Sequence, residues 1–239
     1  MVASASLAVD GERVARERRV VMRSFERLYS QDTRMSLERP GDPGRAELER
    51  FITERFAAVH GARVAGFLPL LLGFWSGSVC RAALGIRPAR ADALFLEQYL
   101  DQPAEQVIAG LCRVPVARAT VIEIGNLVAA PGASTPLLYL LLLALLDRAG
   151  YRWLMFTATP EVRHGIRTLG FEIMPVCAAD PGRLADASGW GSYYDSNPQV
   201  MLGCVEDGMR RSAADPHASA LLRRADALID ELASRLRGA

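Results

Sequence analysis

The sequence predicts an α/β (α+β) protein built on one mixed sheet, with helices on both of its faces. Between residues 120 and 176, β-rich and helical segments alternate in the order β-α-β-α-β, which is typical of strands joined by right-handed crossovers. Two earlier β-rich segments are joined by a short turn, and such a hairpin makes part of the sheet antiparallel. Half of the 239 residues are hydrophobic, so the chain can bury a sizeable core.

Residues 1–36 predict a basic amphipathic extension. Residues 12–29 place apolar side chains at helical spacing among six arginines and three glutamates. Such a helix either packs on its own domain or docks on an acidic carrier protein or an anionic membrane. A secretory signal carries its positive charge before the apolar stretch, and here the order is reversed. We therefore expect a cytoplasmic protein.

A helix and a hairpin follow. Residues 46–60 carry a helical apolar stripe, and Gly61 is suited to end that helix. His60, in the last turn, is interpreted as structural because a cation there favours the helix dipole. Nearly continuous apolar runs at 64–74 and 79–86 flank a turn-rich link and predict two paired strands. The two longest apolar runs, 64–75 and 136–146, are well below the roughly 20 residues of a bilayer span, so they are interpreted as core elements.

The central strand is predicted at residues 120–128. Strict alternation would put Glu123 and Leu127 on one of its faces and Asn126 and Val128 on the other. A carboxylate inside such a β-rich run is costly to bury without a partner or a chemical task. Glu123 is therefore the first candidate for a functional residue.

The other elements follow from apolar periodicity and from turn residues. The helix at 137–148 is apolar nearly all round, which predicts deep burial. The C-terminal residues 207–239 predict an amphipathic helix, which either packs onto the domain or forms a homodimer contact. The remaining predicted segments are a short amphipathic segment at 94–100, helices at 103–111 and 160–169, and strands at 152–157, 171–176 and 199–205.

Composition excludes several classes of function. All 28 basic residues are arginine, so lysine Schiff bases, lysine general bases and P-loop lysines are excluded. The net charge of +1 argues against a general nucleic-acid-binding protein. The four cysteines are far apart and form no CxxC pair, so we expect small buried thiols and no metal site.

Several segments together carry a family resemblance. They are Glu38–Pro40, Phe51 and Ile52 with Phe56, Ala83–Arg87, Leu94–Asp101, Glu123–Leu127, Phe156–Thr159 and Trp190–Asp195. The chain resembles the thermostable hemolysin family over most of residues 37–206. That family is similar to GNAT acyltransferases and to acyl-homoserine-lactone synthases. The resemblance implies a GNAT-like domain at 37–206, with a mostly antiparallel sheet, a central splayed parallel strand pair and helices on both faces.

The resemblance also implies an activity. It points to an N-acyltransferase that moves an acyl group from a thioester to a small amine, such as an amino-acid derivative. The donor would be acyl-CoA or the acyl-phosphopantetheine of an acyl carrier protein, with no tightly bound cofactor. Two alternatives stay open: a membrane-active protein, as the family name implies, and a catalytically inactive GNAT-like binding module.

Four residues are catalytic candidates. With no lysine and only three histidines, the base that deprotonates the amine is expected to be Glu123 or Glu97. Glu123 is alternatively a structural partner of Arg87, and Glu97 has a similar ambiguity. Asn126 either orients the substrate or bonds a strand bulge. Tyr194 either protonates the leaving thiolate or belongs to an aromatic plug over the sheet edge.

Donor-binding and substrate-binding residues are expected around the end of the central strand. A typical acetyl-CoA-binding loop has a glutamine or arginine and two small residues, whereas residues 129–136 have one glycine and neither of those polar residues. The donor-binding candidates are Leu127, Val128, Ala129, Gly132, Ser134 and Thr135. The substrate-binding candidates are Arg87, Thr157, Trp190 and Asp195.

Overall fold

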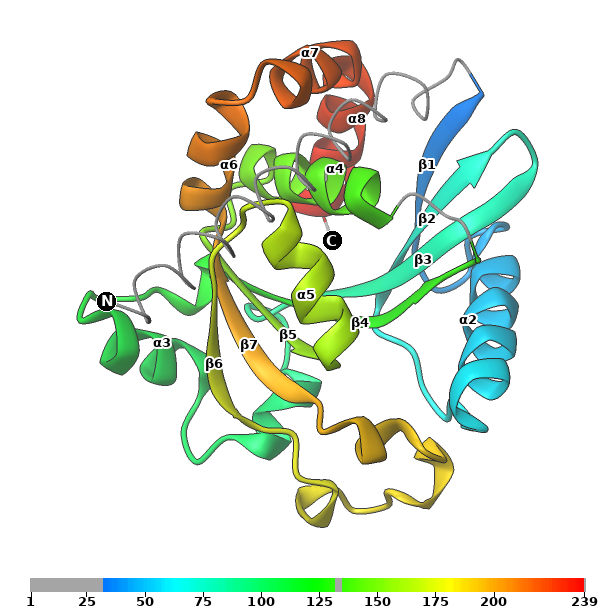
Figure 1. Cartoon of the computed structure of the whole chain (residues 1–239), viewed down its shortest axis with the longest axis vertical. Coiled ribbons are helices and arrows are strands. Elements are labelled where there is room, and N and C mark those ends of the chain that lie inside the picture. Colours follow the sequence, from blue (N-terminus) through cyan, green and yellow to red (C-terminus); the bar gives the residue numbers. More distant parts are fainter. Residues whose placement is uncertain (1–31, 132–134, 239) are drawn as a thin grey trace, which may run out of the picture.

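A single mixed sheet forms the centre of the computed structural model, which describes residues 32–131 and 135–238. Its strand order is β1-β2-β3-β4-β5-β7-β6 (Figure 1). Neighbouring strands pair antiparallel, except that β4 and β5 pair parallel. The predicted mixed, mostly antiparallel sheet with a central parallel pair is therefore confirmed.

The bounds of the elements agree with most of the predicted segments. The strands are β1 (Thr33–Glu38), β2 (Leu70–Ser76), β3 (Val79–Pro88), β4 (Val121–Ala129), β5 (Trp153–Ala158), β6 (Ile173–Ala178) and β7 (Gln199–Cys204). The α-helices are α2 (Arg45–His60), α3 (Ala104–Cys112), α4 (Thr135–Arg148), α5 (Pro160–Thr168), α6 (Val205–Ala213), α7 (Pro216–Arg224) and α8 (Asp226–Arg237). Short 3₁₀ segments are η1 (Phe95–Tyr99), η2 (Arg118–Thr120), η3 (Pro181–Arg183), η4 (Ser188–Trp190) and η5 (Tyr193–Ser196).

Helices cover both faces of the sheet (Figure 1). The leucine-rich α4 is buried nearly all round, and it packs with α5 to α8 against the face that carries Leu72 and Ile122. On the opposite face, α2 packs against Leu71, and α3 with η1 packs against Val121. Adjacent strand residues point to opposite faces, so these three apolar clusters follow from strand alternation.

The apolar residues of the C-terminal helices pack within their own chain. Where the sequence predicted one amphipathic helix, the structure has α7 and α8, preceded by α6. Asp215 caps α7 by accepting hydrogen bonds from the backbone N–H groups of His217 and Ala218. Leu221, Leu232 and other stripe residues are buried in the same apolar cluster as α4. The structure therefore shows the first of the two predicted alternatives, in which the C-terminal apolar residues pack onto the domain.

The structure differs from the sequence prediction at two strands. No strand was predicted where β1 lies, and the strand predicted at 64–74 begins only at Leu70. The buried Arg45 explains this second difference, because its guanidinium donates to the carbonyl oxygens of Leu68 and Pro69 at 3.1 and 2.8 Å. Backbone groups that a strand would pair are taken by this side chain, so the chain before Leu70 stays irregular.

A bulge in β4 changes which residues share a face. Gly85 of β3 pairs with Gly125, but Ala83 pairs with Val128, so β4 has one residue more than β3 between these pairs. Asn126 lies there with a left-handed φ of 50°. After it, Leu127 packs with the α4 cluster and Val128 with the α2 cluster. The predicted faces of these two residues were wrong, because a bulge reverses strand parity.

β4 and β5 separate just before the bulge. Their pairing runs from Val121 with Trp153 to Ile124 with Phe156 and stops there, although both strands continue. The parallel pair is therefore splayed at its carboxyl end. In α/β sheets such a divergence leaves an opening at the strand ends, where ligands bind.

Gly85 tests how tightly the bulge packs. A Cβ atom on Gly85 would lie 2.7 Å from Asn126 Oδ1 and 2.8 Å from Leu68 Cβ. Gly85→Ala is therefore expected to lower the free energy of unfolding by about 1–3 kcal/mol, the usual effect of overpacking. Gly110→Ala is the matched control, because Gly110 lies in α3 with open space around its Cα and should gain about 0.5–1 kcal/mol. Denaturant unfolding measures both, and equal effects would contradict the tight packing.

Candidate functional site

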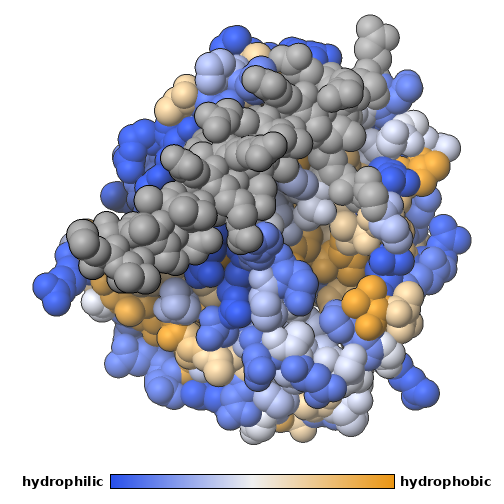
Figure 2. All heavy atoms as spheres, in the orientation of Figure 1, coloured by the Kyte–Doolittle hydropathy of each residue, from blue (hydrophilic) through white to orange (hydrophobic). Residues whose placement is uncertain are grey.

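A cleft of about 810 Å³ opens where β4 and β5 diverge. Its walls are the C-terminal half of α2, the loop at residues 63–68, η1, the start of α5 and the loop at residues 184–196. Figure 2 shows a hollow with hydrophobic residues between α2 and α5. The cleft therefore gathers segments that are far apart in the sequence around one strand end.

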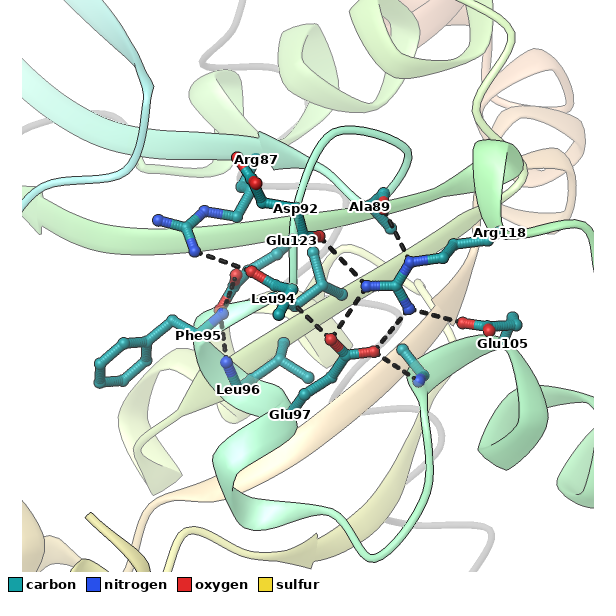
Figure 3. Close-up of polar contacts among 12 residues, drawn as sticks. Arg87, Ala89, Asp92, Leu94, Phe95, Leu96, Glu97, Glu105, Arg118 and Glu123 are labelled. Atoms are coloured by element: carbon teal, nitrogen blue, oxygen red, sulfur yellow. Dashed lines mark hydrogen bonds and ion pairs between the residues drawn. The ribbon is translucent and has the colours of Figure 1, made fainter. Parts of the chain in front are cut away.

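Glu123 is a buried carboxylate in the lining of this cleft. Its side chain is 3% exposed and accepts hydrogen bonds from the backbone N–H groups of Phe95 and Leu96 at 2.8 and 2.9 Å (Figure 3). Burial raises the pKa of Glu123 to about 7, although the two N–H groups and the charge of Arg87 act in the opposite direction. A carboxyl group with this pKa can both take and return a proton near neutral pH.

Glu97 has the opposite environment. It receives hydrogen bonds from the backbone N–H groups of Leu94 and Ala104, and it forms an ion pair with Arg118 at 2.7 Å (Figure 3). Burial would raise the pKa of Glu97, but Arg118 and the N–H groups outweigh burial and lower it. Glu97 lies outside the cleft lining. The structure therefore gives it the role of an anchor for η1.

Arg118 is a residue that the sequence reasoning missed. Its guanidinium bridges Glu97 and Glu105 and donates to the carbonyl oxygens of Ala89 and Asp92. It thereby fixes the segment that supplies the two N–H groups for Glu123. A lone arginine before a strand carries no sequence signal for this role.

Arg87 lies beside Glu123 without an ion pair to it. The two residues are register partners on β3 and β4, and Arg87 lines the cleft. Its guanidinium donates to the Ala93 carbonyl oxygen at 2.9 Å. Among the described residues, no arginine forms an ion pair with Glu123. The predicted alternative, in which Glu123 is the ion-pair partner of Arg87, is therefore not observed.

Asn126 holds the loop that forms one wall. Its Oδ1 accepts a hydrogen bond from the Leu68 backbone N–H at 3.0 Å, and its Nδ2 donates to the Gly66 carbonyl at 3.3 Å. The side chain also lines the cleft. Asn126 was expected either to orient the substrate or to bond a strand bulge. It lies in the bulge itself, and its side chain bonds a loop that is 58 and 60 residues away in the sequence.

Aromatic rings form another wall. Trp190 packs against Phe56, Phe95 and Tyr193, with ring centroids 5.4–6.2 Å apart. These rings line the cleft, whereas Tyr194 is hydrogen-bonded to the Tyr99 hydroxyl at 2.6 Å and lies outside the lining. Burial raises the pKa of Tyr194. Tyr194 is therefore placed as a packing residue of this wall rather than as an acid facing the cleft.

The loop with these rings is docked on the end of α2. Backbone hydrogen bonds join Arg63 N–H to the Gly189 carbonyl at 2.6 Å and Ser192 N–H to the His60 carbonyl at 2.8 Å. His60 also lines the cleft, and partial burial lowers its pKa although Glu161 acts in the opposite direction. His60 was expected to be structural, and its position in the lining was not predicted.

The other candidates divide into three groups. Leu127, Val128, Ala129 and Thr157 line the cleft, and so does Trp190. Thr135 begins α4 and Asp195 is exposed, and neither contributes to the lining. Gly132 and Ser134 lie outside the described residues, as does the basic segment at 12–29.

A small apolar cavity of about 70 Å³ adjoins the cleft between α4, α5 and the sheet. The two share Ile124, Leu127, Phe156 and Val162 in their linings. Further into the cavity the lining includes Leu142, Leu143 and Ile166. Glu172 and Cys204 are also in the lining, but most of it is hydrocarbon, so an alkyl chain that entered from the cleft would meet mainly apolar side chains.

The described part of the chain has neither a metal-binding cluster nor a helix suited to crossing a membrane. No group of three or more histidine, cysteine, aspartate or glutamate side chains there is placed to hold a metal ion. Among the helices at residues 32–131 and 135–238, none combines the length and the apolar composition that crossing a bilayer requires.

Comparison with known proteins gives a family match. The family model described as thermostable hemolysin matches residues 38–209. No curated protein sequence matches the chain. The match includes strands β2 to β7, the cleft and every described candidate residue.

Three solved structures resemble the chain at low sequence identity. FeeM, an N-acyl amino acid synthase from uncultured soil microbes, has a TM-score of 0.51 and 14% identity, covering 75% of this chain and 95% of that one. LasI, an acyl-homoserine lactone synthase, has a TM-score of 0.49 and 10% identity over 74% and 91%. MesI, a CoA-dependent acyl-homoserine lactone synthase, has a TM-score of 0.45 and 15% identity over 86% and 96%. The likeness to FeeM confirms the predicted fold.

Burial of Glu123 predicts a specific pH dependence of stability. Because folding raises its pKa from 4.5 to about 7, its contribution is fully present below pH 4.5 and is lost as the pH rises through 7. Glu123→Gln removes this titration. The variant should gain stability relative to the parent by on the order of 2 kcal/mol between pH 5 and pH 8. Denaturant unfolding at the two pH values measures the difference, and a difference that is constant with pH would contradict the raised pKa.

Proposed function

Because the chain belongs to the thermostable hemolysin family and has the fold described above, we propose that it is an N-acyltransferase. It moves an acyl group from a thioester, either acyl-CoA or an acyl carrier protein, to a small amine such as an amino acid. The observation that carries the proposal is the buried, titratable Glu123 in a cleft at the splayed end of β4 and β5. The similarity to FeeM supports it, since that protein is described as an N-acyl amino acid synthase.

The donor lies along the unpaired edge of β4. Beyond Ile124, the edge that faces β5 has no strand partner, and Leu127, Val128 and Ala129 line the cleft there. Its backbone N–H and C=O groups can pair with the amide groups of a pantetheine arm. A backbone N–H close to the thioester also stabilises the oxyanion that forms during attack.

Glu123 moves the proton. The amine nitrogen attacks the thioester carbonyl carbon, a C–N bond forms, and the amine proton passes to the Glu123 carboxylate. The C–S bond then breaks, and protonated Glu123 returns the proton to the leaving thiolate. The pKa of about 7 suits both transfers, because the proton acceptor must be ionised in the first step and acidic in the second. Arg87, beside Glu123, binds a negative group of the acceptor.

Removing the carboxylate tests this role. Glu123→Gln is expected to lower kcat about 10²–10⁴-fold, because general base catalysis contributes on that order. In the parent, kcat/KM should rise as the pH rises through about 7, where Glu123 ionises. Release of free thiol from a panel of acyl-CoA and acyl-carrier thioesters, with an amine library, measures both.

Glu54→Gln is the control, because Glu54 is exposed on α2. Folded parent protein that binds a donor but turns over none of the panel would favour the inactive binding module. Lysis of erythrocytes by purified protein, without thiol release, would favour the membrane-active alternative.

The apolar cavity predicts a preference for the length of the acyl chain. Val162 of α5 lines both the cleft and the cavity, so Val162→Phe narrows the passage between them. We expect kcat/KM to fall about 10–100-fold for long-chain donors and little for acetyl donors. Val114→Phe, at an exposed position outside both linings, is the control. An equal loss for all chain lengths would place the acyl chain elsewhere.

A further inference from the structure

Arginines around the cleft lack carboxylate partners. Arg55, Arg63 and Arg87 line the cleft, and within the described residues none of them has a carboxylate oxygen within 4 Å. Elsewhere many arginines are ion-paired. These are Arg45, Arg118, Arg148, Arg152, Arg183, Arg210, Arg211 and Arg235. The lining of the cleft also includes the carboxyl groups of Glu123, Glu161 and Asp186, so its charge is mixed, and its three arginines are the lining groups that can contact an anionic ligand.

Arg55 is fixed at the outer end of the cleft. It lies in α2 and is half-buried, and its Nε donates to the Ala129 carbonyl oxygen at 3.2 Å, at the last residue of β4. Among the residues that the structure describes, this is the one hydrogen bond of the Arg55 guanidinium. It orients the planar group and leaves both terminal nitrogens, with their N–H groups, for a ligand. A guanidinium held in this way is suited to contact two oxygens of one anion.

A second guanidinium approaches the same segment from another element. Arg81 of β3 donates through Nη2 to the Pro131 carbonyl oxygen at 3.4 Å, and its own carbonyl accepts a hydrogen bond from Ala130 N–H. Arg81 forms no ion pair with a described carboxylate. Two arginines from α2 and β3 therefore converge on residues 129–131, just beyond the unpaired edge of β4.

We propose that Arg55, flanked by Arg81, binds the phosphate of the donor's phosphopantetheine arm. This proposal rests on the proposed function and adds the residues that recognise the donor. Glu123 marks the inner end of the cleft, and Ala129 lies further along β4. Their partners on β3, Arg87 and Ala82, are five residues apart, which is roughly 17 Å at the usual rise of a strand. An arm whose thioester lies near Glu123 and which follows β4 would carry its phosphate towards Arg55. Arg87, next to Glu123, is left for the acceptor.

Binding measurements test the site without turnover. Calorimetry with CoA, 4′-phosphopantetheine and pantetheine is run on the parent, Arg55→Gln, Arg81→Gln and the control Arg50→Gln, an exposed α2 residue outside the cleft. Arg55→Gln should weaken binding of both phosphorylated ligands at least tenfold, since hydrogen bonds to charged groups contribute that much. Arg81→Gln should weaken them less, and pantetheine affinity should be unchanged in every variant.

Comparing CoA with 4′-phosphopantetheine also distinguishes the two possible donors of this phosphate, acyl-CoA and an acyl carrier protein. Binding of CoA by the parent identifies CoA as a donor, whereas binding of phosphopantetheine without CoA identifies a carrier protein. An equal loss for pantetheine, a loss confined to CoA, or no loss in Arg55→Gln would overturn the proposal. So would parent protein that binds neither phosphorylated ligand.

Kinetics distinguish failure of this proposal from failure of the proposed function. In Arg55→Gln, KM for the phosphorylated donor should rise while kcat and the KM for the amine stay the same. A rise in the KM of the amine instead would assign Arg55 to the acceptor and overturn the proposal. Arg55-dependent binding of phosphopantetheine in a protein that releases no thiol would support the phosphate site and contradict the acyltransferase.

Discussion

The left-handed backbone conformation of Asn126 is the constraint on which the cleft depends. It adds one residue to β4, so Leu127 faces α4 and Val128 faces α2. Pairing with β5 ends two residues earlier, at Ile124. The side chain of Asn126 then holds the loop at 66–68 through two hydrogen bonds. Asparagine tolerates a positive φ better than most residues do, and it also has the donor and acceptor that this loop needs.

Glu123, buried in the cleft lining, and Glu97, partly buried outside it, differ in their burial and in the groups that compensate it. Glu123 has two backbone N–H groups and no arginine within ion-pair distance among the described residues, so burial prevails and its pKa rises. Glu97 has two backbone N–H groups and Arg118, and its pKa falls. The deeper burial of Glu123 and the ion pair of Glu97 with Arg118 together separate a carboxyl group that can exchange protons near pH 7 from one that stays ionised. Such a separation of pKa values is how sites divide chemical and structural roles.

Sequence patterns predicted the elements whose periodicity is strong and local. The stripe of α2, the leucines of α4 and the β4–α4–β5–α5 order were all readable. The irregular segment before β2 could not be predicted from the sequence, because it depends on hydrogen bonds from Arg45 to carbonyl oxygens 23 and 24 residues away. Of the site, Glu123 was identifiable as a charge in an apolar strand. The roles of Arg118 and Arg55 were not, since both depend on backbone carbonyls brought near only by the fold.

Several arginines of this lysine-free chain have structural roles that a lysine could not perform. Arg45, Arg118 and Arg55 each donate to main-chain carbonyls, a role that the planar guanidinium performs with several N–H groups at fixed angles. The other N–H groups of Arg45 and Arg118 donate to carboxylates and to further carbonyls, and these contacts hold loops in place. Arg55 makes one such bond and stays half-buried at the cleft. The ammonium of a lysine bound to the same carbonyl could not present two parallel N–H groups, so anchoring and anion recognition would compete there instead of coexisting.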